Sequence, residues 1–404
     1  MEGNNKKTIC IVTPGYISSN PRVVKEADAL WEAGFKVRVV FSQGNLEGAR
    51  QFDEILLKEK PWQRSAVRWS PFRRREKLLY YKSKFRYHVV RRLPSFVWSF
   101  GRLAEYGEGR IYKEIAKLAV SEKADLYIGH YPVGLAAAAH AAFHCRTKLG
   151  YDVEDLHTEE SLPVKQKERI KKIESRYLPH CSHVSAVSES IADEMVQRYN
   201  INRPIVIHNV FPLSERNNID NQIKDRKGPA LSLYWYSQVI GEDRGIQDAI
   251  KASGILKGKV QIHFRGSVSQ EVKNKFVALA RGCGVEDNLY FHPPVSPTEL
   301  LSRAVEHDVG LALDQPVSKS RLLTVANKLF FYFLAGLAVA ATDIPGQRYI
   351  MSTCPEAGFL YPPGDFLSLA DGLNMFLSEP KLLQSFKQAA LQAAYEKWNW
   401  EKES

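Results

Sequence analysis

Short apolar runs alternate with helical segments along most of this chain, and this alternation constrains the fold more than any other feature. Near the start, Thr8–Thr13 and Lys36–Phe41 are predicted to be strands, with a helix over Pro21–Trp31 between them. Asn20 suits the N-cap of that helix. A strand, a helix and a second strand in this order form a crossover between parallel strands. The sequence therefore predicts an α/β protein with a parallel sheet.

The alternation occurs twice along the chain. Leu213–Gly228 separates the two halves and is polar and charged without apolar periodicity, which is typical of an exposed linker. A length of 404 residues also suits two domains better than one. We predict two Rossmann-like parallel-sheet domains, an N-terminal one over 1–212 and a C-terminal one over 230–385, joined by a linker over 213–229.

Composition limits the class of protein. The hydrophobic fraction of 44% and the charged fraction of 25% are those of an ordinary soluble globular protein. The five cysteines are scattered, which argues against a zinc site and a disulfide framework and fits a reducing cytosol. Neither a signal peptide nor a membrane-spanning run is apparent, so we expect a cytoplasmic protein. The net charge of +11 indicates an anionic partner.

Residues 61–115 interrupt the alternation and are predicted to be an insertion in which aromatic and basic residues are mixed. Acidic residues are nearly absent before Glu105. This pattern favours in-plane contact with an anionic membrane surface at the inner face of the membrane. RNA binding through the same rings and charges, or a solvated face with a few core aromatics, are the alternatives; we expect no nucleic-acid partner. The residues concerned are Trp62, Trp69, Phe72, Tyr80, Tyr81, Phe85, Tyr87 and Trp98 with Arg64, Arg68, Arg73, Arg74, Arg75, Lys77, Lys82, Lys84, Arg86, Arg91 and Arg92.

Polar residues in the first half follow predicted strands. In a parallel sheet, ligands bind beyond the carboxyl ends of the strands. The loop from Gly15 to Arg22, the histidine His130 and the polar loop Glu154–Glu160 all have such positions. A histidine at a strand end is also often only a structural hydrogen-bonding group, and Arg22 could be a solvated first-turn residue. A metal site from His130, Asp155 and His157 lacks the usual helical context, so we predict no metal.

Two segments of the second half suit a phosphate. Thr324–Asp343 is predicted to be a loop, a buried helix capped by Thr324, a stop at Gly336 and a buried strand. The helix start offers free N–H groups, and Lys328 adds a full charge; a plain core helix is the alternative. The turn Ser237–Gly245 also follows a strand and opens a helix, so its N–H groups and Arg244 can face a diphosphate.

Several stretches resemble family 4 glycosyltransferases, whose GT-B fold has two Rossmann-like domains facing across a cleft. They are "SSNPRVVKEADALWEAGFKVRVV", "ADLYIGHY" with "KLGYDVEDLHTEE", and "NKLFFYFLAGLAVAATD". The resemblance covers nearly the whole chain except residues 45–120. It implies that residues 386–404 form a last helix that returns to the first domain. It departs from the family at Leu323 and Phe331, where the family has glutamates that hold the donor's ribose and sugar hydroxyls.

The resemblance also implies site residues. It matches His130 to a histidine near the reacting centre, and we take His130 and Asp155 as the catalytic candidates. Arg244 matches a family lysine and Gln238 stands nearest a family arginine, so Arg265 could replace the missing charge. The donor-binding candidates are Gln238, Arg244, Gly245, Arg265, Thr324, Asn327 and Lys328. The acceptor-binding candidates are Gly15, Tyr16, Asn20, Arg22, Glu154 and His157.

The expected function is a metal-independent, retaining glycosyltransferase of hexosyltransferase type, without a cofactor. It would transfer sugar from a nucleotide diphosphate sugar to a carbohydrate or lipid-linked acceptor in surface polysaccharide synthesis. A non-catalytic nucleotide- or glycan-binding GT-B protein and a sugar-nucleotide epimerase of the same fold are the alternatives.

Overall fold

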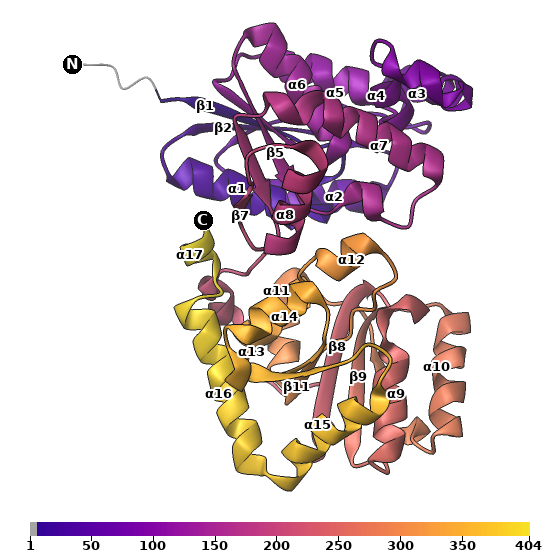
Figure 1. The fold of residues 1–404 in the computed structure, drawn as a ribbon, viewed down its shortest axis with the longest axis vertical. Coiled ribbons are helices and arrows are strands. Elements are labelled where there is room, and N and C mark those ends of the chain that lie inside the picture. The colour runs from indigo at the N-terminus through magenta and orange to yellow at the C-terminus, as the bar shows by residue number, and fades with distance from the viewer. Residues whose placement is uncertain (1–5) are drawn as a thin grey trace, which may run out of the picture. The chain divides into compact units, whose positions relative to one another are not determined.

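The computed structural model describes residues 6–404, which form two compact units, one ending at Ile207 and the other spanning His208–Ser404 (Figure 1). Each unit is built on its own parallel sheet with helices on both faces. The predicted pair of Rossmann-like parallel-sheet domains is confirmed. No helix within residues 6–404 is long and apolar enough to cross a membrane.

The first unit has a seven-stranded sheet in the order β3-β2-β1-β4-β5-β6-β7. Every strand pair is parallel, as the crossover pattern predicts. The chain order reverses beside β1, where β2 and β4 flank it on opposite sides, so ligands are expected at the carboxyl ends of β1 and β4. The strands are β1 (Thr8–Val12), β2 (Lys36–Gln43), β3 (Gln63–Arg68), β4 (Leu126–His130), β5 (Lys148–Val153), β6 (His183–Ala186) and β7 (Ile205–Val206).

Helices of the first unit cover the two faces of its sheet, with α1 and α2 on one face and α5, α6 and α7 on the other (Figure 1). Asn20 caps α1 as predicted, because its side-chain oxygen accepts a hydrogen bond from the Val23 N–H. The helices are α1 (Pro21–Glu32), α2 (Glu47–Leu57), α3 (Arg74–Arg92), α4 (Leu103–Glu108), α5 (Tyr112–Val120), α6 (Tyr131–Cys145), α7 (Val164–Tyr177) and α8 (Glu189–Tyr199).

The segment 61–115, predicted as an insertion, begins within the sheet. Its first part forms the edge strand β3, which pairs with β2, and the rest forms α3, the 3-10 helix η2 (Ser95–Ser99), α4 and the start of α5. Trp62 and Trp98 are fully buried, and Arg110 covers the rings of Trp69 and Tyr80. Trp62 and Trp98 therefore stabilise the unit from inside and are unavailable to a membrane, while Trp69 and Tyr80 are half-buried.

The second unit has a six-stranded sheet in the order β10-β9-β8-β11-β12-β13, again entirely parallel. Its strands are β8 (Leu231–Val239), β9 (Val260–Ser267), β10 (Leu289–His292), β11 (Val309–Ala312), β12 (Ala338–Thr342) and β13 (Gly358–Tyr361). Its helices are α9 (Ile246–Ile255), α10 (Gln270–Gly282), α11 (Pro297–Ala304), α12 (Lys319–Leu323), α13 (Asn327–Ala335), α14 (Pro345–Ser352), α15 (Phe366–Ser378), α16 (Pro380–Glu396) and α17 (Trp400–Glu403).

Alternate residues of β8 enter two different cores, as a strand covered on both faces requires. Leu233 and Trp235 pack in the core shared with α9, α10 and α15. Tyr234 packs in the core shared with α11, α13 and α16, where Trp398 also lies. Residues 386–404, expected to return to the first domain, make up the end of α16 and α17 and fall within the second unit.

The start of α13 differs from the prediction. The helix begins at Asn327 with Ala326 at the N-cap and no capping side chain. Thr324 instead ends α12, where its hydroxyl donates to the Ser320 carbonyl. Sequence reasoning missed the short helix α12, so it placed the cap two residues early. The helix stop at Gly336 is confirmed, with φ at 70° in the left-handed region.

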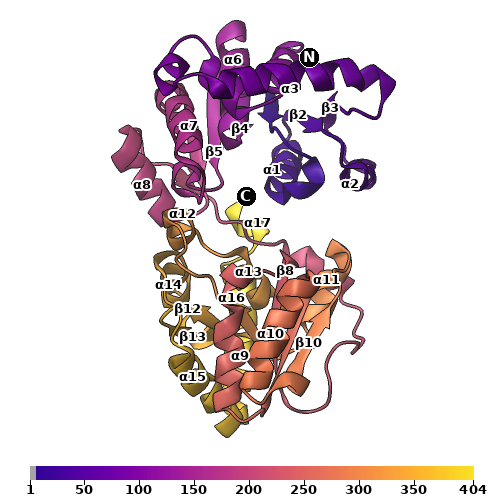
Figure 2. The ribbon, with the colours of Figure 1, turned by 90° about the vertical axis from the view of Figure 1, so that its right-hand side faces the viewer.

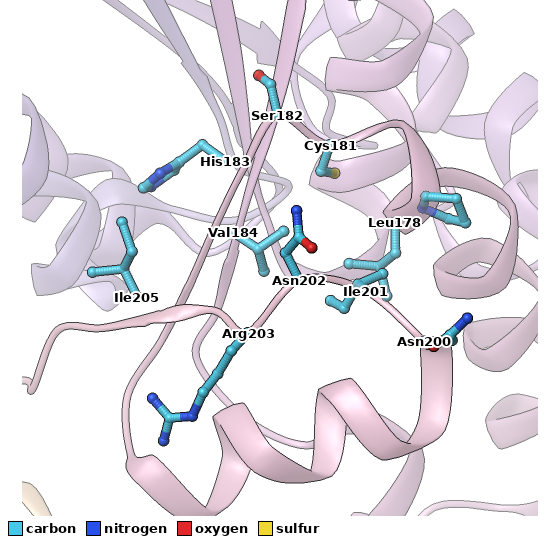
Figure 3. Close-up of a pocket in the computed structure, with 11 residues that line it drawn as sticks. Leu178, Cys181, Ser182, His183, Val184, Asn200, Ile201, Asn202, Arg203 and Ile205 are labelled. Carbon is cyan, nitrogen blue, oxygen red and sulfur yellow. The ribbon is translucent and has the colours of Figure 1, made fainter.

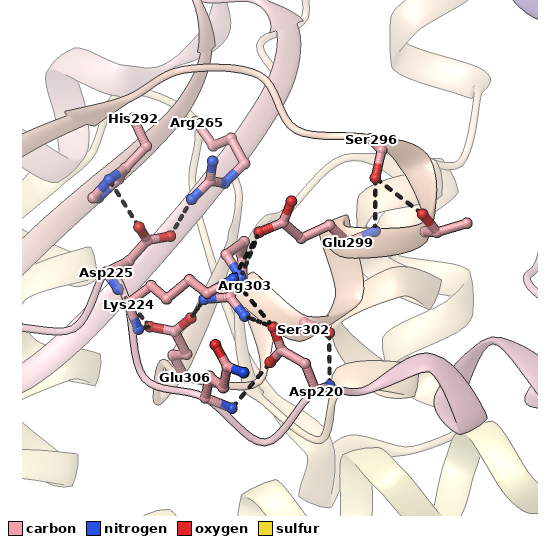
Figure 4. Close-up of polar contacts among 12 residues, drawn as sticks. Asp220, Lys224, Asp225, Arg265, His292, Ser296, Glu299, Ser302, Arg303 and Glu306 are labelled. Atoms are coloured by element: carbon pink, nitrogen blue, oxygen red, sulfur yellow. Dashed lines mark hydrogen bonds and ion pairs between the residues drawn. The ribbon is translucent and has the colours of Figure 1, made fainter.

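The segment predicted to be an exposed linker is bound to the second unit (Figure 4). The backbone N–H groups of Lys224, Asp225 and Arg226 all donate to one oxygen of Glu306, at 2.9, 2.6 and 3.2 Å. We call residues 220–226 the strap. Within the strap Asp225 is buried and Arg226 is half-buried, while residues 220–224 are exposed.

Candidate active site

The carboxyl ends of β1, β4 and β5 bring the predicted first-unit residues together. His130, the last residue of β4, is completely buried. Its Nδ1 lies 2.7 Å from a Glu154 oxygen and its Nε2 lies 2.6 Å from a Glu26 oxygen. Both ring nitrogens are thus occupied by carboxylates. A direct contact between this ring and a sugar hydroxyl requires that one of these hydrogen bonds opens.

The charge of His130 follows from the same contacts. Burial alone would lower the pKa of His130, but Glu26, Glu154 and Asp152 outweigh this effect and raise the pKa to about 10. The ring is therefore an imidazolium at neutral pH and donates from both nitrogens. It can orient carboxylates and stabilise negative charge, but it cannot act as a general base in this state.

Arg22 is neither solvated nor free. Only 4% of the residue is exposed. Its Nε and Nη2 donate to the two oxygens of Asp152, at 2.5 and 2.7 Å, and its Nη1 donates to the Ile207 carbonyl at 2.8 Å. Burial raises the pKa of Asp152, but Arg22 and His130 outweigh it and hold the pKa at about 2. Arg22 therefore supports the site by holding the Asp152 carboxylate from within the protein.

The other acceptor candidates surround this network. Asn20 donates from its amide to Glu154 at 2.8 Å, which connects the α1 cap to the His130 cluster. Gly15 and Tyr16 lie in the loop after β1, where the Tyr16 hydroxyl accepts from the Leu46 N–H. These candidates share one sheet edge with His130.

His157 lies in the polar loop after β5, which also carries the half-buried Asp155. The His157 Nδ1 lies 2.6 Å from Glu160. Burial lowers the pKa of His157, but Glu160 and Asp155 raise it to about 9. Sequence reasoning missed Tyr131, whose ring lies 5.4 Å from His157 and whose φ of 61° is uncommon for a residue with a side chain. Such backbone strain is often found at functional sites.

Among the described residues 6–404, one group of side chains has metal-ligand spacing. Potential ligand atoms of His130, Asp152 and Glu154 lie within 4.8 Å of one another. However, both Asp152 oxygens already bind Arg22 and the imidazolium balances Glu154. The residues therefore form a closed ion network that fits a divalent cation poorly.

In the second unit, most donor-site candidates lie near the carboxyl ends of β8, β11 and β12. The amino group of Lys328 lies over the Trp235 and Tyr236 rings, 5.4 and 6.0 Å from their centroids. Within residues 6–404 it makes no hydrogen bond or ion pair. Burial lowers the pKa of Lys328, Asp314 raises it, and the nearby charges of Arg244 and Arg321 lower it further. Lys328 and Arg244 are thus close enough to interact.

Arg321, on α12, is a cation that sequence reasoning missed. Its Nη2 lies 2.9 Å from Asp243, and the Nε of Arg244 lies 3.6 Å from the same carboxylate. Asp243 thus holds two arginines together beside Lys328. Nothing in the sequence links position 321 to position 243, because the contact depends on the unpredicted helix α12.

Gly245 is required by its surroundings. Its φ of 71° is in the left-handed region, and a Cβ there would lie 2.2 Å from the Leu313 carbonyl oxygen. This glycine lets the turn after β8 approach the end of β11. Gln238 and Asn327 are exposed at the ends of β8 and α13.

Arg265 does not supply the missing donor-site charge in this structure. Its guanidinium donates to the Tyr234 hydroxyl at 3.2 Å and the Pro293 carbonyl at 2.7 Å, and it pairs with Asp225 of the strap (Figure 4). Only 3% of the residue is exposed. The position of Arg265 on a predicted strand gave no indication that Asp225 of the strap would bind it.

The two positions that lack family glutamates are apolar in the structure as well. Phe331 is 1% exposed and its ring packs against Phe211 and Tyr236, at 5.3 and 4.6 Å. Leu323 is half-buried at the end of α12. A buried phenylalanine cannot bind a hydroxyl, so any contact with the donor's hydroxyl groups must come from other residues.

A pocket of about 390 Å³ lies elsewhere in the first unit (Figure 3). It is lined by residues around the start of β6, by Asn200–Arg203 and by Ile205, including His183 and Arg203. This is the amino end of the strand, whereas ligands of such sheets bind at the carboxyl ends. None of the predicted site residues lines it.

Comparison with known proteins gives a consistent result. Residues 22–215 match the model of Glycosyltransferase Family 4. No curated protein matches the chain. Among solved structures, a glycosyltransferase from Rickettsia africae ESF-5 superimposes with a TM-score of 0.69 at 14% identity, over 99% of this chain and 96% of that one.

Two further structures agree. Anabaena Alr3699/HepE, solved in complex with UDP, has a TM-score of 0.68 at 13% identity, covering 98% of this chain and 97% of that one. The sucrose-phosphate synthase of Thermosynechococcus elongatus has a TM-score of 0.66 at 13% identity, covering 98% and 96%. Together with the two parallel sheets, these matches show that the chain has the GT-B fold of glycosyltransferases and that its residues 22–215 are similar to Glycosyltransferase Family 4.

Proposed function

We propose that this chain is a retaining glycosyltransferase that moves a sugar from a nucleotide diphosphate sugar to a carbohydrate or lipid-linked acceptor. The observation that carries the proposal is the amino group of Lys328, which has no ion pair within residues 6–404 and lies beside Arg244 and Arg321. Three cations held together disfavour one another, and a diphosphate would remove that repulsion. HepE, solved with UDP and with UDP-glucose, gives independent support.

The proposed chemistry follows from the leaving group. Cleavage of the bond between sugar and diphosphate leaves negative charge on the phosphate oxygens, while the sugar gains oxocarbenium character. Lys328, Arg244 and Arg321 would stabilise that charge without a metal, as an oxyanion hole does in other reactions. The N–H groups at the start of α13 would contribute in the same way.

We assign the acceptor to the first unit. Asp155 and His157 lie in the loop after β5, and Glu154 is bound by Asn20 and His130. His130 would act as a positioning residue that fixes Glu154, since both its ring nitrogens are occupied. The hexosyl specificity and a place in surface polysaccharide synthesis, at the inner face of the membrane, complete the proposal.

A non-catalytic nucleotide-binding protein is the second candidate. Leu323 and Phe331 favour it, because the family's two hydroxyl-binding glutamates are replaced by apolar side chains. A sugar-nucleotide epimerase of the same fold would use the same cations. All three functions require nucleotide binding, and only a transferase needs an acceptor.

A thermal-shift titration with UDP, GDP and their glucose conjugates tests the shared requirement. We expect one of these nucleotides to raise the melting temperature, and Lys328→Ala to abolish the shift. Arg281→Ala, which removes an exposed arginine paired only with Glu286, is the matched control and should keep it. No shift with any of these nucleotides would overturn the proposal.

A second measurement separates the candidates. Release of free nucleotide from the sugar conjugate that gave the shift, only when a membrane lipid extract is added, indicates transfer. Conversion of the conjugate to its epimer without an acceptor indicates an epimerase. Binding without either reaction indicates the non-catalytic protein.

A further inference from the structure

An apolar stripe lies on the outer face of α3, which runs along the outside of the first unit (Figure 2). Leu78, Tyr81, Phe85 and Val89 are 65%, 51%, 73% and 43% exposed. Spacings of three and four residues place their side chains on one side of the helix. Large apolar groups gathered in this way on a surface usually mark an interaction site.

The opposite face of α3 is the one that packs on the protein. Ser83 and Val90 are buried there, and Glu76 pairs with Arg50 at 2.6 Å. The stripe is therefore additional to the contacts that hold α3 in place. Three further exposed aromatic residues flank the helix, Phe72 before it and Phe96 and Phe100 in and after η2.

The charges around the stripe have one sign. Arg74, Arg75, Lys82 and Arg92 are exposed and have no ion pair within residues 6–404. Helical spacing places these four residues on or beside the apolar side of α3. Glu76, the one acidic residue of α3, is buried with Arg50 and neutralises none of them.

We propose that the outer face of α3 docks on an anionic lipid bilayer, with Leu78, Tyr81, Phe85 and Val89 in the interface and the flanking cations on the headgroups. Amphipathic helices with apolar residues on one side and Lys and Arg around them bind membranes in this way. The inference rests on the proposed function in one respect: it gives a lipid-linked acceptor a surface on which to meet the enzyme.

The side chains of the stripe favour a bilayer over RNA, since both partners are anionic and the flanking cations suit either one. Bases stack on aromatic rings, but half of the stripe is the aliphatic pair Leu78 and Val89. The rings best placed beside cations, Trp69 and Tyr80, are covered by Arg110 within the protein. An anionic bilayer satisfies both the aliphatic residues and the cations.

A groove of about 690 Å³ beside Phe96 extends the basic surface. Ser95 and Ser99 of η2 line one side of it, and α7 lines the other with three basic residues and one acidic residue: Glu168, Lys171, Lys172 and Arg176. Lys171 makes no ion pair within residues 6–404. A lipid headgroup phosphate fits the charge of this groove.

Vesicle co-sedimentation of the full chain tests the docking. We expect binding to vesicles of equal parts phosphatidylglycerol and phosphatidylcholine, and little binding to phosphatidylcholine alone. The double variant Leu78→Ser/Phe85→Ser should bind at least about tenfold more weakly, since two apolar side chains no longer leave water. Arg75→Gln/Lys82→Gln should weaken binding and reduce its dependence on salt.

The matched control lies on α2 of the same unit. Phe52 and Ile55 are 65% and 71% exposed, close to the exposures of Leu78 and Phe85. Phe52→Ser/Ile55→Ser should bind vesicles as the wild type does. Equal losses in both double variants, equal binding to neutral vesicles, or selective binding of a single-stranded RNA with no vesicle binding would each overturn the inference.

Nucleotide binding, measured on the same samples, keeps the two proposals distinguishable. The variant Leu78→Ser/Phe85→Ser should retain the nucleotide-induced thermal shift of the wild type, which also shows that it folds. A chain that binds vesicles through α3 but no nucleotide would refute the proposed function alone. A chain that binds nucleotide but no anionic vesicles would refute the docking alone.

Discussion

The guanidinium of Arg22 binds both carboxylate oxygens of Asp152, at 2.5 Å from Nε and 2.7 Å from Nη2, in the interior of the first unit. Asp152 also accepts from the Ser185 hydroxyl at 2.5 Å and lies 3.5 Å from His130. Arg22 thus joins α1 to β5. Through Asp152 it also contributes to the charge surrounding His130, the last residue of β4.

Replacing Arg22 should unfold the protein more easily than replacing an exposed arginine. Arg22→Ala leaves the Asp152 carboxylate buried with only His130 and Ser185, and such losses cost about 3–5 kcal/mol. Arg203→Ala, which breaks exposed pairs with Glu189 and Asp193, should cost at most about 1 kcal/mol. Denaturant unfolding of both variants measures the difference, and equal costs would contradict the buried role of Arg22.

His130 should make the stability depend on pH in the alkaline range. Its pKa in the folded chain, about 10, lies above the ordinary value of 6.5. The folded state therefore binds the extra proton between these values, and the stabilisation is complete below pH 6.5 and is lost as pH rises toward 10. His130→Gln should flatten the fall of melting temperature across this range.

A control keeps this prediction specific. His88→Gln removes an exposed histidine of α3 and should leave the pH profile unchanged. Some alkaline loss should persist in His130→Gln, because Glu160 and Asp155 also raise the pKa of His157, to about 9. A profile that is the same for His130→Gln and the wild type would show that the imidazolium is not held as described.

The sequence predicts the sheets well, because the strands are apolar runs flanked by polar turns. The predicted strand Lys36–Phe41 corresponds to β2, which extends two residues further, to Gln43. The predicted cap at Asn20 is confirmed. Periodicity failed where a strand carries charge: β3 contains Arg64 and Arg68 at the sheet edge and was included in an insertion.

The candidate site was less predictable, because partners distant in sequence decide what each charge does. Arg22 and Arg265 are cations near strand ends, yet Asp152 and Asp225 bind them internally. Arg321 lies in a helix with no clear apolar pattern, yet it joins Arg244 beside Lys328. The residue types suggested a charged site. Only the contacts distinguish Lys328, which has no ion pair within residues 6–404, from Arg22 and Arg265, which are bound internally.

Glu306 should hold the strap in place. One of its oxygens accepts from three successive N–H groups and the other lies 2.5 Å from Arg303. Glu306→Gln removes the charge that both partners bind, at a cost of about 1–3 kcal/mol. Amide hydrogen exchange should become faster at Lys224, Asp225 and Arg226. Glu286→Gln, which alters an exposed pair with Arg281, should leave these amides protected.

Asp243 should compete with the donor's diphosphate. Its carboxylate holds Arg321 at 2.9 Å and Arg244 at 3.6 Å, and it is half exposed, so a phosphate can displace it. Asp243→Asn removes that competing charge, so the variant should bind the nucleoside diphosphate about two- to fivefold more tightly than the wild type, on the scale of an exposed ion pair. Arg321→Gln should bind more weakly. Isothermal titration measures both. Tighter binding cannot result from general damage to the fold. Weaker binding in Asp243→Asn would show that Asp243 contributes to nucleotide binding directly and that a phosphate does not replace it beside Arg244 and Arg321.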